Sequence, residues 1–239
     1  MHEQITNEPM LEPTVNNQPN ALDANGPRTA IKSNVGVLLV VEGPSDIQFL
    51  RRISRILHLD NVTIPDLNVL EETGRLIFVP FGGGCLHYWS HRLGPLAWPE
   101  FHLYDKETPP ETGLRKQAAR AVNGRVGCRA AITSKRSLEN YLSPSAIEDA
   151  KGIRILFSDA DSVAEVASRA CLPPHCQWDD LSHRAKRRLR NRSKKWLNTT
   201  AVDRMTPARL AQQDPVGELE GWLRTIANLA IIGEGALRR

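Results

Sequence analysis

The stretch that decides the fold is Val37-Leu38-Leu39-Val40-Val41-Glu42-Gly43-Pro44-Ser45-Asp46. Its first five residues are apolar and rich in β-branched side chains, a run typical of a strand buried on both faces of a parallel sheet. Glu42 and Gly43 close this strand, and Pro44 and Ser45 open a helix in which apolar side chains recur at helical spacing. The stretch therefore predicts one strand-helix unit with an acid at the carboxyl end of the strand.

Strand and helix patterns alternate on the carboxyl side of this unit. Further strands are predicted at 75–81, 101–104 and 128–133, with helices around 89–91 and at 112–122. This alternation implies right-handed crossovers. The sequence predicts an α/β, Rossmann-like fold, with a mainly parallel sheet of about four strands flanked by helices. Beyond residue 145 the pattern becomes helical, at 145–151, 160–170, 180–196, 206–212 and 214–230.

The chain divides into three predicted parts. Residues 1–34 are rich in Asn, Pro, Glu and Thr without an apolar period, which predicts a disordered N-terminal tail. Residues 35–150 form the predicted α/β domain, and residues 151–239 a helical C-terminal region that contains a basic helix. Near the end, apolar side chains at helical spacing predict a helix that faces the core or a partner: Trp222, Leu223, Ile226, Leu229 and Ile232.

Composition limits the classes of protein to consider. None of the apolar runs in the 239 residues approaches the roughly 20 residues that a bilayer requires. The polar, acidic N-terminus is unlike a secretory signal, so we expect a cytoplasmic protein without a membrane partner. Its four cysteines are expected to be free thiols. The formal charge of +4 is concentrated at 184–195, which indicates a polyanionic partner.

Four acids are predicted to converge. Ligands of open α/β sheets bind beyond the carboxyl ends of the strands. Glu42 ends the first strand, Asp105 and Glu107 follow the third, and Asp46 lies one helical turn beyond Glu42. Each acid by itself is also typical of a helix cap or a solvated loop. Together they would repel one another unless cations neutralise them, and oxygen ligands favour Mg²⁺ or Mn²⁺.

These residues resemble a known pattern. Val40-Val41-Glu42-Gly43-Pro44-Ser45-Asp46, followed by Phe49-Leu50, resembles the first motif of Toprim domains, and Leu103-Tyr104-Asp105-Lys106-Glu107 resembles their D-x-D motif. Phe81-Gly82-Gly83-Gly84 and Arg136-Ser137-Leu138-Glu139-Asn140-Tyr141-Leu142-Ser143-Pro144 favour the nuclease branch named for overcoming lysogenisation defect (OLD). The resemblance covers approximately residues 35–150.

The resemblance implies a Toprim-like catalytic domain and roles for its acids. Glu42 would act as general base or metal ligand, Asp46, Asp105 and Glu107 would hold Mg²⁺ or Mn²⁺, and Glu139 would be a further ligand. Glu107 stands where the family has a second Asp, so its carboxylate lies one methylene further out. The ATPase domain that usually precedes the nuclease domain is absent from this sequence. Any regulation by ATP would therefore come from another chain, a separate ATPase or a defence-system protein, or be missing.

Basic residues are the candidates for contact with nucleic acid. The predicted helix at 180–196 has no acid after Asp180, which favours a phosphate-binding face over a merely solvated one. Gly82, Gly83 and Gly84 suit either close approach to a phosphate or a tight turn. The basic candidates are Lys106, Arg136, Arg184, Lys186, Arg187, Arg188, Arg190, Arg192, Lys194 and Lys195.

Three functions remain compatible with these patterns. The favoured one is a Mg²⁺-dependent nuclease that cleaves or nicks nucleic acid, with DNA as the expected substrate. The first alternative is a non-catalytic module that binds nucleic acid or protein. The second is a primase-like phosphotransferase, since a metal site does not by itself choose between hydrolysis and transfer.

Two cysteine-histidine groups have spacing that could suit zinc. They are Cys85 with His87 and His91, and Cys171 with His175 and Cys176. Neither contains a paired C-x-x-C, so free thiols and surface histidines are favoured.

Overall fold

A four-stranded parallel sheet forms the centre of the molecule. The computed structural model describes residues 35–82 and 86–236. Within them lie β1 (Val37–Val41), β2 (Leu76–Pro80), β3 (Glu100–Tyr104) and β4 (Cys128–Ile132), in the order β2-β1-β3-β4 and all parallel. The α/β class and the parallel sheet are thereby confirmed. The predicted N-terminal tail, Gly83, Gly84 and Cys85 lie outside the described residues.

The strand order places a crevice beside β1. The chain moves from β1 outward to β2 and then crosses back over β1 to β3. Such a reversal leaves an opening beyond the carboxyl ends of the two strands that flank it. Here these strands are β1 and β3, whose residues are all buried. Residues that follow β1 and β3 therefore reach the same edge of the sheet.

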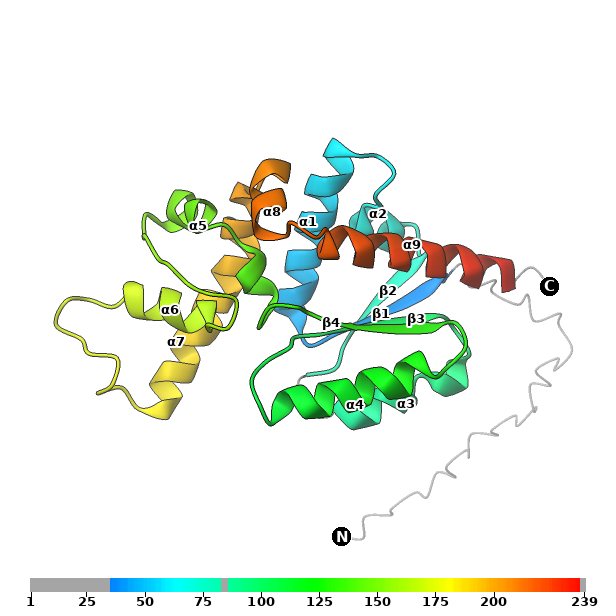
Figure 1. Ribbon diagram of the computed structural model, residues 1–239, viewed down its shortest axis with the longest axis horizontal. Helices are drawn as coiled ribbons and strands as arrows, with labels where there is room; N and C mark the ends of the chain where they lie inside the picture. The colour runs from blue at the N-terminus through cyan, green and yellow to red at the C-terminus, as the bar shows by residue number, and fades with distance from the viewer. Residues whose placement is uncertain (1–34, 83–85, 237–239) are drawn as a thin grey trace, which may run out of the picture. The chain divides into compact units, whose positions relative to one another are not determined.

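Helices cover both faces of the sheet (Figure 1). On one face, α1 (Pro44–Asp60) and α9 (Glu218–Ala236) join the cluster of buried apolar residues that includes Leu39. On the other face, α3 (Leu86–Arg92) and α4 (Glu111–Asn123) join a second cluster that includes Val40. Successive residues of a strand point to opposite faces, so β1 supplies both clusters.

A short helix, α2 (Leu67–Glu72), was not predicted. It buries only Leu67 and Leu70, and six residues are too few to display a helical period. The Asp66 carboxylate caps it by accepting a hydrogen bond from the Asn68 N–H at 2.9 Å. The only signal in the sequence was this capping residue.

The helices between β4 and α9 lie beside the carboxyl edge of the sheet (Figure 1). Asp214 explains why the last helix begins at Glu218 and not at residue 214 as predicted: its carboxylate accepts hydrogen bonds from the first N–H groups of α9 at 2.9 and 2.8 Å. The elements in order are η2 (Leu138–Tyr141), α5 (Pro144–Lys151), α6 (Val163–Ala170), α7 (His183–Trp196), the π-helical turn η3 (Leu197–Ala201), η4 (Val202–Arg204) and α8 (Pro207–Gln213).

One apolar cluster joins residues from both sides of residue 150. It contains Ile53 of α1, Ile147 of α5, Leu197 of η3 and Trp222 of α9. The predicted domain boundary near residue 150 stays a prediction, but packing at this position is continuous. Burial of these side chains fixes η3, which directly follows α7, against α1.

The expected helix stripe near the C-terminus faces the core for most of its length. Four of its residues are buried, whereas Ile232 is 56% exposed. Close approach to β1 depends on Gly36 and Gly233: a Cβ atom at Gly233 would lie 2.1 Å from the Gly36 carbonyl oxygen. Only glycine permits backbones to meet at this distance. The buried residues are Trp222, Leu223, Ile226 and Leu229.

A polar network is buried between β3 and α4. The Tyr104 hydroxyl hydrogen-bonds His102 Nδ1 at 2.8 Å, and His102 Nε2 bonds Glu100 at 2.7 Å. Arg125 donates two hydrogen bonds of 2.7 Å to the Glu100 carboxylate. Burial would raise the pKa of Glu100, but His102 and Arg125 hold it below its ordinary value. The paired groups fix β3, the strand that leads to Asp105.

No helix in the described segments combines the length and the apolar character that spanning a bilayer requires. The described cysteines, Cys128, Cys171 and Cys176, are free thiols.

The contact between Gly36 and Gly233 gives a test of the packing of α9. We expect Gly233→Ala to lower the free energy of unfolding by about 1–3 kcal/mol, because the added methyl group overlaps a backbone carbonyl. Gly221 lies in the same helix with open space around it, so Gly221→Ala should raise stability by roughly 0.5–1 kcal/mol. Urea denaturation of both variants measures the difference. Equal effects would contradict the close approach.

Candidate metal centre

Three carboxylates meet at the carboxyl edge of β1 and β3. Glu42 directly follows β1, and Asp105 and Glu107 follow β3. One oxygen from each lies within 4.8 Å of the others. Among His, Cys, Asp and Glu side chains in residues 35–82 and 86–236, this group is the one close enough to hold a metal ion. The structure thus brings together three of the four acids predicted to converge.

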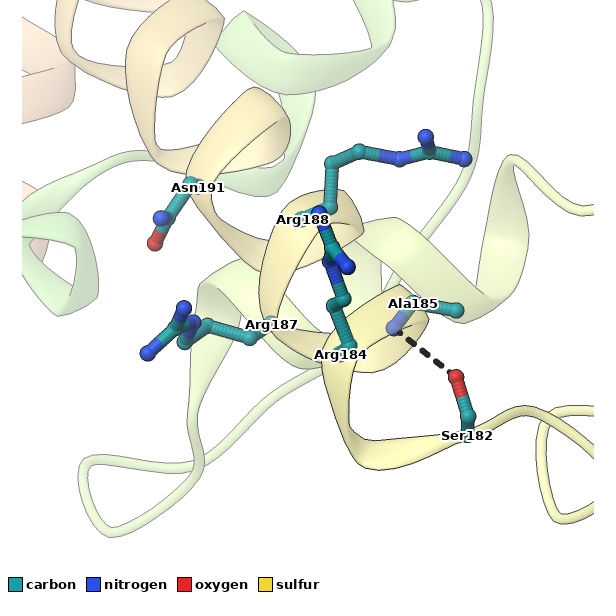
Figure 2. Close-up of a pocket in the computed structure, with 6 residues that line it drawn as sticks. All are labelled: Ser182, Arg184, Ala185, Arg187, Arg188 and Asn191. Carbon is teal, nitrogen blue, oxygen red and sulfur yellow. Dashed lines mark hydrogen bonds between the residues drawn. The ribbon is translucent and has the colours of Figure 1, made fainter.

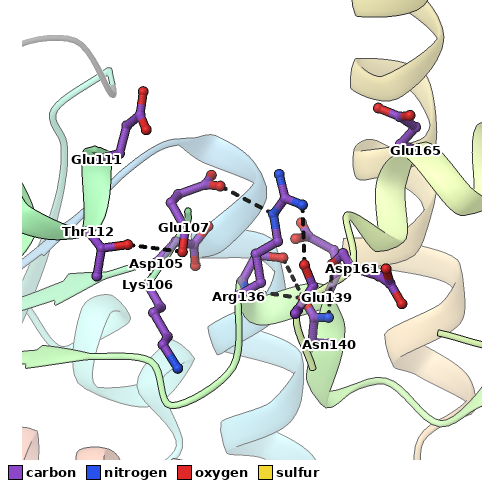
Figure 3. A network of polar contacts seen from close by, with 12 residues as sticks. Asp105, Lys106, Glu107, Glu111, Thr112, Arg136, Glu139, Asn140, Asp161 and Glu165 are labelled. Atoms are coloured by element: carbon purple, nitrogen blue, oxygen red, sulfur yellow. Dashed lines mark hydrogen bonds and ion pairs between the residues drawn. The ribbon is translucent and has the colours of Figure 1, made fainter. Parts of the chain in front are cut away.

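The turn after β3 aims Asp105 and Glu107 at one place. Glu107 adopts a left-handed backbone conformation with a φ of 51°, which is uncommon for a residue other than glycine. Its N–H donates to the Arg136 carbonyl at 3.0 Å, and its carboxylate lies 3.5 Å from Arg136 Nε. Lys106 points away, as Figure 3 shows, and its ammonium donates to the Ser134 carbonyl at 3.1 Å.

Arg115 holds Glu42 in position. Its Nε and Nη2 donate to the same carboxylate oxygen, at 3.1 and 2.9 Å. Both side chains are largely buried, with 9% and 14% of their surfaces exposed. Burial raises the pKa of Glu42, and the Arg115 guanidinium opposes this rise. Arg115 was absent from the predicted site, although its helical spacing with Ala118, Ala119 and Val122 already placed a cation on a buried face.

Gly82 supports Glu42 from the backbone side. Its φ is +78°, and its N–H donates to the Glu42 carbonyl at 2.9 Å. That N–H is therefore engaged within the protein, and the positive φ accounts for a glycine at this strand-to-helix turn.

Lys194 occupies the centre of a second group of acids. Its ammonium lies 3.3 Å from Asp46, 3.8 Å from Asp105 and 3.7 Å from Glu139. The three carboxylates are almost fully buried, whereas 30% of the Lys194 side chain is exposed. The pKa of Lys194 is raised well above its ordinary value, mainly by Glu139 and then by the two aspartates. The sequence had placed this lysine on a nucleic-acid-binding face, and that contact stays a prediction.

Hydrogen bonds from the protein orient the same three acids. Asp46 accepts from the Gly43 N–H at 2.8 Å, and Asp105 accepts from the Leu138 N–H at 3.2 Å. Glu139 accepts from the Asn198 amide at 2.5 Å. Asn198 lies in the π-helical turn that follows α7, and no pattern in the sequence marked it as part of the site.

Burial and mutual repulsion act against ionisation of the central acids. Burial raises the pKa of Asp105 well above its ordinary value, and the negative charges of Asp46, Glu42 and Glu139 add to the rise. Burial also raises the pKa of Asp46. Burial alone would raise the pKa of Glu139, but Lys194 and Asn198 hold it below its ordinary value. The centre is thus short of positive charge.

The residues present fit a hard divalent cation. Five carboxylates face three cationic side chains, Lys194, Arg115 and Arg136, so two negative charges remain in excess. The buried Oδ1 of Asp46 accepts no hydrogen bond among the described residues, and its charged neighbour is the Lys194 ammonium at 3.3 Å. Carboxylate oxygens without nitrogen or sulfur ligands favour Mg²⁺ or Mn²⁺. The acidic cluster could therefore hold such an ion, with Glu42, Asp105 and Glu107 as its nearest set.

A cavity of about 330 Å³ opens beside the acids. Asp105, Glu107 and Glu139 contribute to one side of it, and Arg136, Arg190 and Lys194 add positive charge. Figure 3 shows Arg136 reaching toward Glu107, with Glu165 on a neighbouring helix. A charged, polar cavity of this kind suits an anionic substrate.

The basic residues of α7 have different surroundings. Arg190 pairs with Glu165 of α6 at 3.1 Å, and Lys186 lies 5.9 Å from the centre of the Trp178 ring. Five others are exposed, namely Arg184, Arg187, Arg188, Arg192 and Lys195. The basic residues of the predicted face thus have three kinds of surroundings: some line the cavity, some contact α6, and others lie on the open surface.

Comparisons with known proteins add one likeness. No protein-family model and no curated protein matches the chain. Among solved structures, the chain is similar to the C-terminal region of the OLD protein of Xanthomonas campestris pv. campestris, with 14% identity and a TM-score of 0.44. The alignment covers 83% of this chain and 97% of that one. A likeness of this size concerns the course of the backbone and assigns no activity.

Removal of the Lys194 charge should destabilise the metal-free protein. We expect Lys194→Met to lower the free energy of unfolding by about 1–3 kcal/mol in EDTA, because three buried carboxylates lose a counter-ion that is itself partly exposed. Mg²⁺ should restore much of the loss by supplying positive charge. Thermal melts with EDTA and with Mg²⁺ measure both effects. The exposed neighbour serves as control, and a Lys195→Met variant that melts like Lys194→Met would contradict this role.

Removal of the Asp105 charge should have the opposite sign. Because the pKa of Asp105 is higher in the folded than in the unfolded chain, its ionised form costs stability at neutral pH, and this cost disappears as the pH falls toward the unfolded value. We expect Asp105→Asn to stabilise the protein in EDTA by about 0.5–2 kcal/mol. The amide oxygen can still accept from Leu138.

The same variant should also lose the gain in melting temperature that Mg²⁺ gives the parent. Asp60→Asn, at the exposed far end of α1, is the matched control and should keep this gain. A destabilised Asp105→Asn variant with an undiminished response to Mg²⁺ would show that the acids are not a metal centre.

Proposed function

We propose that the protein is a divalent-cation-dependent phosphodiesterase that cleaves or nicks nucleic acid, with DNA as its substrate. The observation that carries this proposal is the meeting of Glu42, Asp105 and Glu107 within 4.8 Å at the edge where an α/β sheet binds ligands. Mg²⁺ or Mn²⁺ bound there supplies Lewis-acid stabilisation of a phosphodiester oxygen. Asp46 and Glu139 complete the acidic surroundings.

The protein groups have separable tasks in this reaction. The Glu42 carboxylate would accept the proton of a water molecule whose oxygen attacks phosphorus, while the bond from phosphorus to the leaving sugar oxygen breaks and that oxygen takes up a proton from solvent. Arg115 keeps that carboxylate oriented. Arg136 lines the cavity and would bind a non-bridging oxygen of the substrate phosphate, whereas Arg190 is paired with Glu165. Lys194 holds Asp46, Asp105 and Glu139 together against their mutual repulsion.

The motif resemblance supports the same chemistry. The residues that resemble Toprim motifs, from Glu42 and Asp46 to Asp105 and Glu107, come from two separate segments yet gather at one edge of the sheet. We therefore propose an OLD-like nuclease domain. Its cytoplasmic location is a prediction of the composition, and a separate ATPase or a defence-system protein is a candidate partner that the resemblance suggests.

Lys194 favours a second candidate function, a module that binds nucleic acid without catalysis. Its ammonium already neutralises part of the acidic centre without a metal. In such a module the carboxylates would be structural, and binding would survive their replacement. Metal-dependent turnover separates the two functions.

Cleavage of supercoiled plasmid in Mg²⁺ or Mn²⁺ tests the proposal. We expect the parent protein to nick or linearise the plasmid and EDTA to abolish this activity. Glu42→Gln should lower the rate on the order of 10²–10⁴-fold, because an amide cannot accept the proton. Gel analysis of time courses measures the rates.

The control for loss of charge is again Asp60→Asn, which should cleave like the parent. Equal rates for Glu42→Gln and the parent would reject the assigned base. Salt-sensitive binding without any metal-dependent cleavage by the parent would favour the non-catalytic module.

A further inference from the structure

Three arginines on one face of α7 border a groove next to the acidic cavity. The groove has a volume of about 500 Å³ and is lined by Ser182, Arg184, Ala185, Arg187, Arg188 and Asn191. Arg184, Arg187, Arg188 and Asn191 stand at helical positions i, i+3, i+4 and i+7, which lie on one side of a helix. Figure 2 shows these side chains extending outward from α7. We call these four residues the α7 strip.

The guanidinium groups of the strip are available to a ligand. Arg184, Arg187 and Arg188 are exposed, and no ion pair joins them to an acid in the described parts of the chain. Arg190, on a neighbouring line of the same helix, is in contrast occupied by Glu165. Unpaired arginines attract anions and match phosphate oxygens in geometry.

The strip leads into the candidate metal centre. Asn191 lines both the groove and the acidic cavity, and Lys194, one turn further along, contacts Asp46, Asp105 and Glu139. From Arg184 to Lys194 the helix advances about 15 Å, because each residue adds roughly 1.5 Å. Phosphates along one strand of a duplex advance about 3.4 Å per step along the duplex axis, so the distance from Arg184 to Lys194 corresponds to about four steps.

Packing of α6 fixes which face of α7 meets the ligand. Ser168 of α6 donates a hydrogen bond of 2.9 Å to Ser193 of α7, and both residues are buried. Glu165 adds its ion pair with Arg190. Rotation of α7 would break these contacts, so the strip keeps its exposed orientation.

The lining of the groove favours phosphates over bases. Proteins that hold single strands combine basic grooves with aromatic side chains on which bases stack, and the groove lining contains no aromatic residue. The nearby Trp178 is 8% exposed and lies under Arg169 and Lys186. We infer that the α7 strip binds the sugar-phosphate backbone of a double-stranded nucleic acid and guides it to the acidic cavity, an inference that rests on the proposed nuclease function.

Binding measurements on the full chain in EDTA test this inference apart from cleavage. The strip variant combines Arg184→Gln, Arg187→Gln and Arg188→Gln. A charge-matched control combines Lys116→Gln, Arg120→Gln and Arg129→Gln, which replace exposed basic residues of α4 and β4. Fluorescence anisotropy with labelled 20-base-pair DNA and RNA duplexes, and with single strands, measures affinity between 50 and 200 mM salt.

We expect the strip variant to bind duplex on the order of 100-fold more weakly at 0.1 M salt, and the slope of log affinity against log salt to fall by about 3, since each phosphate contact contributes about 0.9. The control variant should stay within about threefold of the parent. The two duplexes distinguish DNA from RNA as the source of the phosphates. Equal weakening of both variants, or parent binding to single strands as tight as to duplex, would overturn the inference.

Cleavage by the same samples in Mg²⁺ separates this inference from the proposed function. A strip variant that binds like the parent, beside a parent that cleaves, would refute the strip and leave the nuclease standing. A parent that binds duplex through the strip and never cleaves would refute the nuclease and support the strip. All surface substitutions should leave the thermal melt unchanged, and Arg187→Gln alone, expected to weaken binding on the order of 10-fold, replaces the triple variant if that fails to fold.

Discussion

Electrostatic repulsion among crowded carboxylates is the constraint to which the rest of the structure responds. Asp46, Asp105 and Glu139 are nearly fully buried, and Glu42 and Glu107 lie beside them. A single buried carboxylate without a partner is costly, and several in one place are costlier. The fold concentrates them because the carboxyl ends of β1 and β3 flank its strand-order reversal. Their compensation requires cations from elements far away in the chain.

That compensation comes from elements that share no local sequence with the acids. Arg115 reaches Glu42 from α4 on one face of the sheet, and Lys194 reaches the buried acids from α7 beside its carboxyl edge. The apolar cores on the two faces hold these helices in place. Burial of apolar side chains thus offsets the free-energy cost of gathering the carboxylates. Such compensation is common where function requires unfavourable groups.

Local patterns were sufficient for the sheet and for the acids. The apolar run at β1 and the acid that follows it are contiguous in sequence, so position relative to the strand could be predicted directly. Strand-helix alternation then predicted a parallel sheet, and parallel strands bring their carboxyl ends to one edge. Helix ends that are set by a capping side chain were harder to predict from the sequence, as the Asp214 cap at the start of α9 shows.

The partners of the acids could not be predicted because tertiary packing delivers them. The sequence does not distinguish Lys194 from the other basic residues of α7. Its position among the acids depends on the orientation of α7, which packing against α6 and η3 sets. Asn198 depends on a π-helical turn, for which the sequence carries no reliable signal. The buried pairing of Glu100 with His102 and Arg125 likewise emerges only when α4 covers β3. The carboxylates of the site could therefore be predicted from the sequence more readily than the side chains that pair with them.

The late position of Lys194 has a consequence for how the protein is made. A ribosome synthesises chains from the N-terminus, so Asp46, Asp105 and Glu139 emerge before the helix that carries their counter-ion, Lys194. During that interval the sheet can form only with its acids open to water or to dissolved cations. Nascent chains that stop before α7 would therefore expose Asp46, Asp105 and Glu139 without Lys194, and the completed centre would arise only once α7 and η3 have been synthesised.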